Sequence, residues 1–288
     1  ASSDGSVDLA RTMGVRTLDL DMTIPFTAAR ARNAGLQDLT KACAGIEYVQ
    51  FVDGDCELAD GWLEKGAAQL ASNRSIAAVS GRLREKYPEN SVYNLLCDIE
   101  WDGPTGEVKT CGGIAMMRVS AMQSTHGFRE DLIAGEEPEL CIRFRKSGWK
   151  IWRLVDEMAT HDAAIYHFGQ WWKRSVRAGY AFAQGANLHG SRPERHGVRE
   201  SRSAWLWGLG IPLATLMGLA WWGEGGLVLL LAYPVQVVRI ALRGGRSTRE
   251  NWWRAVFLVL GKFAEVTGQA KFLVHRIFDA RPRLIEDK

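Results

Sequence analysis

The stretch that decides the fold is Tyr48-Val49-Gln50-Phe51-Val52-Asp53-Gly54-Asp55-Cys56. Its apolar run, rich in β-branched and aromatic residues, ends in two acids separated by a glycine, which predicts a buried strand with carboxylates at its carboxyl end. Ligands of open α/β sheets bind just beyond such strand ends. Neighbouring carboxylates repel each other unless a cation or a proton separates them. The stretch therefore predicts a divalent-metal site on Asp53 and Asp55, with a solvated Asp-Gly turn as the alternative.

Predicted strands and helices alternate along the chain on both sides of this stretch. Such an order favours the α/β class, with a mostly parallel twisted sheet flanked by helices. Residues 82–110, rich in charged and aromatic side chains, interrupt the order and predict an irregular excursion over the site. Strands are predicted at residues 15–21, 48–52, 76–79, 111–118 and 149–154, and helices at residues 26–39, 60–71 and 138–147.

Composition limits the classes of function. The chain has 288 residues, enough for one large domain or two smaller ones. Its net charge of +3 is too mild to indicate a nucleic-acid partner, and we expect none. The five cysteines are odd in number and lack a Cys-x-x-Cys spacing, which fits a reducing compartment. The loop-like opening Ala1–Ser6, without an initiator Met, predicts a fragment that starts inside a fold.

Two apolar segments follow residue 204. Trp205–Trp222 is eighteen residues without a charge, about 27 Å as a helix, and Gly225–Leu242 has the same length. Each is just long enough to cross a hydrocarbon core of about 30 Å. Arginines lie outside both ends of the pair, which predicts a tight or re-entrant hairpin with both flanks in the cytoplasm. A buried pair of core helices is the alternative.

The stretch that follows the second apolar segment is basic and amphipathic. From Arg243 to Lys288, ten Lys or Arg stand against five Asp or Glu. Aromatic side chains and lysines are interleaved over residues 251–278, which predicts a helix in the membrane interface. An anionic membrane surface is the partner that this charge favours.

A second acidic cluster is Gly135-Glu136-Glu137-Pro138-Glu139. Proline favours the first turn of a helix, and acids near a helix N-terminus interact favourably with the helix dipole. A carboxylate held near a metal and a phosphate is a candidate general base. Acids that only cap the helix are the simpler alternative.

The order of these motifs resembles the family 2 glycosyltransferases of the GT-A fold, over residues 3–185. Asp53-Gly54-Asp55 matches the family's Asp-x-Asp motif, and Gly135-Glu136-Glu137 matches its Gly-Glu-Asp motif with Glu in place of the last Asp. Ser3-Asp4-Gly5-Ser6 is similar to the Asp-Asp-Gly-Ser loop, and Arg30–Gly35 is similar to the Ala-Arg-Asn-x-Gly helix. The family's first strand is missing before the start of this sequence.

The resemblance implies a role for each matching residue. Glu137 would be the catalytic base, and Mg²⁺ or Mn²⁺ would be held by Asp53, Asp55 and His161. The implied donor-binding residues are Asp4, Ser6, Arg32, Asp53 and Asp55. The implied acceptor or sugar-side residues are Gly112, Gly113, Glu136, Gln170, Trp171 and Trp172, the last three from a loose match to the Gln-x-x-Arg-Trp motif of processive members.

Structural alternatives remain open for several of these residues. His161 is equally well explained as a surface histidine, and Arg32 as a solvated arginine on a helix. The tryptophans of the Gln170-Trp171-Trp172 motif are equally compatible with packing against the membrane region.

The expected activity is an inverting, metal-dependent, hexosyltransferase-like transfer of a sugar from a nucleotide-sugar to a glycan or polyprenol-linked acceptor, as in polysaccharide biosynthesis. A nucleotidyltransferase on the same fold is one alternative, and a non-catalytic membrane scaffold is another. We expect an inner-membrane protein in contact with membrane lipid, with its catalytic domain facing the cytoplasm. Its expected parts are a GT-A-like domain lacking its first strand over 1–185, a basic linker over 186–204, a hydrophobic hairpin over 205–242, and an amphipathic helix and tail over 243–288.

Overall fold

The computed structural model describes residues 5–278. Contacts divide the chain into two compact units, described here one at a time. Unit 1 is made of Ala1–Asp53, Asp60–Ser80 and Thr105–Leu154, and unit 2 of Gly54–Ala59, Gly81–Pro104 and Val155–Lys288.

A six-stranded sheet and its helices give the α/β class that the sequence predicts. The long strands β3 and β6 each run from one unit into the other. The strand order is β1 (Tyr48–Phe51), β5 (Ala115–Arg118), β3 (Ile76–Glu85), β6 (Lys150–His161) and β2 (Cys56–Leu58), with β4 (Gly106–Val108) paired to β6.

Strand direction differs from the mostly parallel sheet that was expected. In the register, Met117 of β5 lies opposite Val49 of β1 and Ala78 of β3, and both pairings are antiparallel. The pairings of β2 and β4 with β6 are antiparallel as well. Strands β1 and β3 therefore point the same way, as their helical connection requires, but β5 from much later in the chain lies between them. The alternation of strands and helices along the chain indicates that such strands run parallel, but it does not indicate which strands are neighbours in the sheet.

Unit 1 places its helices around a well-buried core. The core side chains include Phe51, Met117 and Phe144, which are almost completely excluded from solvent. Residues 15–21, expected to form a strand, form none, and Val15 and Leu18 are exposed. The helices of this unit are α1 (Ser6–Thr12), α2 (Ala28–Ala42), α3 (Trp62–Ser72), α5 (Val119–Ser124) and α6 (Glu136–Lys146).

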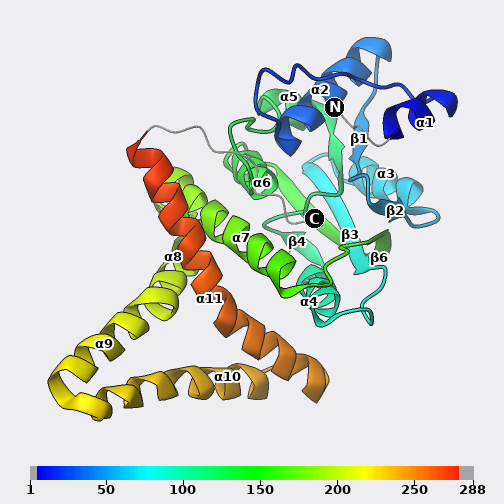
Figure 1. Cartoon of the computed structure of the whole chain (residues 1–288). Coiled ribbons are helices and arrows are strands. Elements are labelled where there is room, and N and C mark those ends of the chain that lie inside the picture. The colour runs from blue at the N-terminus through cyan, green and yellow to red at the C-terminus, as the bar shows by residue number, and fades with distance from the viewer. Residues whose placement is uncertain (1–4, 279–288) are drawn as a thin grey trace. The chain divides into compact units, whose positions relative to one another are not determined.

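Unit 2 is mainly helical, and its helices α7 and α11 lie side by side (Figure 1). Two glycines permit this close approach, because a Cβ on Gly268 would lie 2.0 Å from the carbonyl oxygen of Val176, and one on Gly179 would lie 2.1 Å from that of Glu265. The helices are α4 (Val92–Trp101), α7 (Phe168–His189), α8 (Val198–Trp205), the π-helix η1 (Leu206–Gly210), α9 (Ile211–Trp222), the 3-10 helix η2 (Gly223–Leu231), α10 (Ala232–Leu242) and α11 (Thr248–Ile277).

The apolar region forms one continuous helical run with a sharp bend. Val198–Leu242 is long and apolar enough to cross a membrane, judged by length and composition. Its most apolar window is only 11% buried, so the alternative of a core helix pair does not describe it. The bend falls at Gly223, after which η2 packs back against α9 (Figure 1).

Candidate functional site

A buried arginine joins the two acidic motifs within unit 1. Arg32 Nη2 donates to Asp53 Oδ1 at 2.7 Å, and Arg32 Nη1 donates to Glu136 Oε1 at 2.5 Å. Helix α2 supplies the arginine, the loop after β1 supplies Asp53, and the first turn of α6 supplies Glu136. The structure thus brings together residues from three separate sequence motifs. We call Arg32, Asp53 and Glu136 the arginine cluster.

Electrostatics keep Arg32 charged in this cluster. Burial by itself would lower the pKa of Arg32, but the charges of Asp53 and Glu136 outweigh it and raise that pKa. Two carboxylates face one guanidinium, so the cluster carries a net negative charge. The side chain of Asp53 is 41% exposed, against 15% for Glu136, and it is therefore the more accessible acid.

Backbone also approaches the arginine cluster closely. A Cβ added to Gly113 would lie 3.2 Å from Arg32 Nη2 and 3.3 Å from Asp53 Oδ2. Gly112, just before it, has a φ of +84°, which L-residues rarely adopt. Gly113 thus lies against the cluster, where a side chain would require Arg32 or Asp53 to shift, whereas Gly112 is restricted by its backbone conformation alone.

Glu137 lies next to Glu136 but has different surroundings. Its Oε1 accepts the backbone N–H of Cys111 at 2.7 Å and the thiols of Cys141 at 2.9 Å and Cys111 at 3.2 Å. The residue is only 5% exposed. Its Oε2 has no hydrogen bond from any residue in the range 5–278, so one oxygen is anchored while the other is available.

The two thiols beside Glu137 stay protonated near neutral pH. A hydrogen bond with Cys141 and burial raise the pKa of Cys111 well above its usual value. Burial raises the pKa of Cys141 to about 11. Protonated thiols are donors, so both can hydrogen-bond to Oε1 of Glu137.

A second cluster, in unit 2, contains Asp55 and His161. His161 Nε2 lies 3.1 Å from Asp55 Oδ1, and the ring stacks on Trp101 with centroids 4.7 Å apart. Strand pairing sets this geometry, because Cys56 of β2 lies opposite His161 at the end of β6. The potential ligand atoms of Asp55, Cys56 and His161 all lie within 4.8 Å of one another.

These residues fit a divalent ion. His161 Nδ1 is buried without a hydrogen-bond partner among the described residues, while Nε2 faces the carboxylate. A carboxylate with an imidazole is a common ligand pair for Mn²⁺, whereas Mg²⁺ is usually bound by oxygen alone. The predicted participation of Asp53 as a further ligand stays a prediction.

The remaining predicted residues lie elsewhere. Asp4 is outside the described residues, and Ser6 is an exposed residue at the start of α1. Gln170 caps α7, because its Oε1 accepts the N–H groups of Tyr166 and His167. Trp171, 8% exposed, packs on Phe257 of α11 with ring centroids 4.9 Å apart.

The packing alternative for the tryptophan motif therefore has direct support. Trp172 contacts Trp171 and Phe168, which extends the same aromatic group. A role for Gln170, Trp171 or Trp172 on the acceptor side stays a prediction.

Two residues with a clear positioning role were not identified from sequence. Asn33, inside the Ala-Arg-Asn-x-Gly helix, exchanges 2.8 Å hydrogen bonds with the backbone of Phe128 and so holds the loop before α6. Glu85 is buried, accepts the N–H of Ala163, and fixes the chain just after His161. Burial raises the pKa of Glu85. The position of Asn33 within a family motif was the one available signal.

Comparison with known proteins gives a family match over part of the chain. Residues 1–123 match the family described as Glycosyl transferase family 2. A curated relative, glycosyltransferase AglE of Haloferax volcanii, is 23% identical over 186 residues, which cover 62% of this chain and 59% of AglE. The chain thus spans well under two thirds of the length of that relative.

Solved structures give the fold. A mannosyltransferase of Pyrobaculum calidifontis, PcManGT, solved in complex with GDP-Man and Mn²⁺, has a TM-score of 0.59 and 18% identity, covering 95% of this chain and 75% of its own. TarS 1-349 of S. aureus in complex with UDP-GlcNAc is 15% identical, and the match covers 93% of this chain and 81% of TarS 1-349. Its TM-score is 0.43, which indicates a weaker structural similarity. The chain therefore resembles glycosyl transferase family 2 over residues 1–123, less than half of its length, and shares its fold with PcManGT.

Proposed function

We propose that the chain transfers a sugar from a nucleotide-sugar to a hydroxyl acceptor, with metal dependence and inversion at the anomeric carbon. The arginine cluster is the observation that carries this proposal. It brings an acid of the Asp-x-Asp motif and an acid of the Gly-Glu-Glu motif onto one guanidinium, 21 and 104 residues away in sequence. A transferase of this kind needs its donor-binding acids near its catalytic base, and Glu136 directly precedes the proposed base Glu137.

Glu137 is the proposed general base. Its anchored Oε1 fixes the direction of the side chain, and Oε2 takes the proton of the acceptor hydroxyl as that oxygen attacks the anomeric carbon. Glu136 is a weaker candidate, because its carboxylate is engaged by Arg32. Arg32 and Asp53 face the donor in this proposal. The guanidinium of Arg32 gives up one carboxylate partner and binds the donor diphosphate in its place.

Asp55 and His161 are the proposed metal ligands, and Mn²⁺ suits this pair better than Mg²⁺. A bound divalent ion supplies positive charge for the departing nucleoside diphosphate. The complex of PcManGT with GDP-Man and Mn²⁺ supports a metal-bound nucleotide-sugar donor.

A glycan or polyprenol-linked acceptor and an inner-membrane location with the catalytic residues on the cytoplasmic side complete the proposal. The exposed apolar run Val198–Leu242 supports membrane association. Arginines on both flanks of that run support the cytoplasmic orientation.

The test is a nucleotide-sugar assay on the full chain in detergent with Mn²⁺, measuring release of nucleoside diphosphate from each donor of a panel. Glu137→Gln is expected to lower turnover about 10²–10⁴-fold and to leave Mn²⁺-dependent nucleotide binding nearly unchanged. Glu136→Gln is the matched variant, with a smaller loss in turnover.

Three results would contradict parts of this proposal. Full activity of Glu137→Gln, with loss in Glu136→Gln, would transfer the base role to Glu136. Release of pyrophosphate in place of nucleoside diphosphate would indicate a nucleotidyltransferase. Absence of nucleotide binding with any metal would indicate a non-catalytic scaffold.

A further inference from the structure

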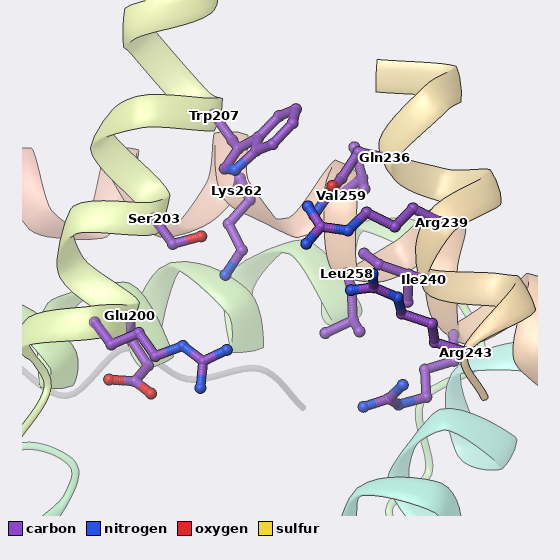
Figure 2. A pocket seen from close by; sticks show the side chains of 12 residues that line it. Glu200, Ser203, Trp207, Gln236, Arg239, Ile240, Arg243, Leu258, Val259 and Lys262 are labelled. Atoms are coloured by element: carbon purple, nitrogen blue, oxygen red, sulfur yellow. The ribbon is translucent and has the colours of Figure 1, made fainter. Parts of the chain in front are cut away.

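A basic pocket lies between helices of unit 2, apart from the residues assigned above. Its volume is about 640 Å³, within the usual range for ligand sites. Figure 2 shows side chains from three directions entering it. Its lining residues are Arg199, Glu200, Ser203, Trp207, Gln236, Arg239, Ile240, Arg243, Arg254, Leu258, Val259 and Lys262.

Helical spacing brings these side chains onto facing surfaces. Arg199, Ser203 and Trp207 recur every four residues along α8 and η1. Arg239 on α10 and Arg243, the residue just after its end, are four positions apart, and Arg254, Leu258 and Lys262 repeat the same spacing on α11. Three helical segments therefore each present one face to a common space.

The charge of the pocket is strongly positive. Five cations line it against the single acid Glu200. Lys262 is paired with Glu265 at 2.6 Å. The four arginines have no ion pair with any of residues 5–278. Converging unpaired cations repel each other, so an anion bound among them would stabilise the arrangement.

The surroundings of the pocket are apolar. On α10, which carries Arg239, the side chains of Val235 and Leu242 are 65% and 76% exposed. Leu206 at the start of η1 is 56% exposed. These residues belong to the run that is apolar enough to cross a membrane. An anion with an attached hydrocarbon chain matches this combination better than a free ion does, because its chain covers exposed apolar surface.

We propose that this pocket binds the phosphate headgroup of an anionic lipid, with the lipid chain along the exposed side of α10. In this proposal Arg239 and Arg243 contact the phosphate together with Arg199 of α8 and Arg254 of α11. The pocket shares no residue with the proposed transferase site, and its occupancy is measured without turnover.

The test is a titration of the full chain in detergent micelles, followed by thermal stabilisation. The probes are dihexanoyl phosphatidic acid, dihexanoylglycerol, which lacks the phosphate, and inorganic phosphate. We expect saturable stabilisation by the phosphatidic acid, at least tenfold weaker binding of inorganic phosphate, and none by dihexanoylglycerol. The double variant Arg239→Gln/Arg243→Gln is expected to bind the phosphatidic acid at least about tenfold more weakly.

Arg202→Gln/Arg249→Gln is the matched control. It removes the same charge from exposed positions on the same flanks outside this pocket, and its affinity is expected to stay within about twofold of wild type. Equal losses in both double variants would show general surface attraction and overturn the pocket. Equal affinity for inorganic phosphate would overturn the lipid assignment, and so would stabilisation by dihexanoylglycerol. Nucleoside diphosphate release from the same preparations tests the transferase proposal separately.

Discussion

Asp53 and Glu136 share one guanidinium, although Asp53 follows a predicted strand and Glu136 precedes a predicted helix much later in the sequence. Their common partner Arg32 is 12% exposed, so both acids depend on it for charge compensation in a poorly solvated place. This relationship allows the sequence motifs to be tested as one physical unit.

Arg32→Gln is expected to destabilise the protein by roughly 2 kcal/mol, because it leaves Glu136 without its cation. The estimate is below that for a fully buried pair, since Asp53 is partly solvated. Chemical denaturation measures the change. Arg16→Gln, which breaks the exposed pair with Asp38, is the control and is expected to change stability by less than about 0.5 kcal/mol. Equal effects would mean that the arginine cluster contributes no special stability.

Removal of either proposed metal ligand should weaken Mn²⁺ binding. Asp55→Asn and His161→Ala are each expected to lower Mn²⁺ affinity at least about 100-fold in the presence of nucleoside diphosphate, measured by calorimetry. Cys56→Ser is the control within the same cluster, with an expected change below about threefold, because Mn²⁺ prefers oxygen and nitrogen ligands. A large loss in Cys56→Ser would instead indicate a thiophilic metal such as zinc.

The contact between α7 and α11 predicts a strong effect from a single methyl group. Gly268→Ala places its Cβ 2.0 Å from a backbone carbonyl, and we expect destabilisation by about 1–3 kcal/mol, seen as a lower Tm. Gly169→Ala on α7 meets nothing within 4 Å and is expected to be neutral or stabilising by about 0.5–1 kcal/mol. A neutral Gly268→Ala would show that these helices separate more easily than their packing implies.

The raised thiol pKa values predict a loss of stability in alkali. Cys141 has a pKa of about 11 when folded and an ordinary value of 9.0. Its contribution is therefore fully present below pH 9 and is lost as the pH rises from 9 to 11, by roughly 3 kcal/mol in total. Unfolding free energies across this range measure it, and Cys141→Ala should flatten the dependence.

Alkylation gives an independent control for the same thiols. The exposed Cys43 should react with iodoacetamide at neutral pH, whereas buried Cys111 and Cys141 should react only on unfolding. Rapid labelling of all three under native conditions would contradict the burial of the Glu137 environment.

Sequence reasoning predicted the class of fold because the order of strands and helices leaves local signals, whereas the roles of the acidic motifs came from a family resemblance and stay predictions. The hydrophobic pattern before Asp53 indicates a buried strand, and Pro138 indicates the first turn of helix α6. The place of β5 between β1 and β3 was missed, because a neighbour from much later in the chain leaves no local pattern. Helix α4 was missed although Ser91 is its N-cap, since charged and aromatic residues obscured its period.

Side-chain direction was the other limit. Nothing in Gly135-Glu136-Glu137 says which acid faces Arg32 and which faces the thiols, because adjacent residues on a helix point about 100° apart and the packing partners decide. The asparagine of the Arg30–Gly35 helix was read as part of a motif, whereas its bonds to Phe128 give it a loop-holding role.

The aromatic contacts of α11 have a practical consequence for anyone who shortens this chain to make it soluble. Tyr93 of α4 and Trp171 of α7 both pack against Phe257 of α11, with ring centroids 5.5 and 4.9 Å away. A protein truncated before Ser247 would lack Phe257, so the rings of Tyr93 and Trp171 would be exposed to water. Solubilisation is therefore better sought by replacing exposed apolar residues of the bend around Gly223 than by removing the C-terminal helix.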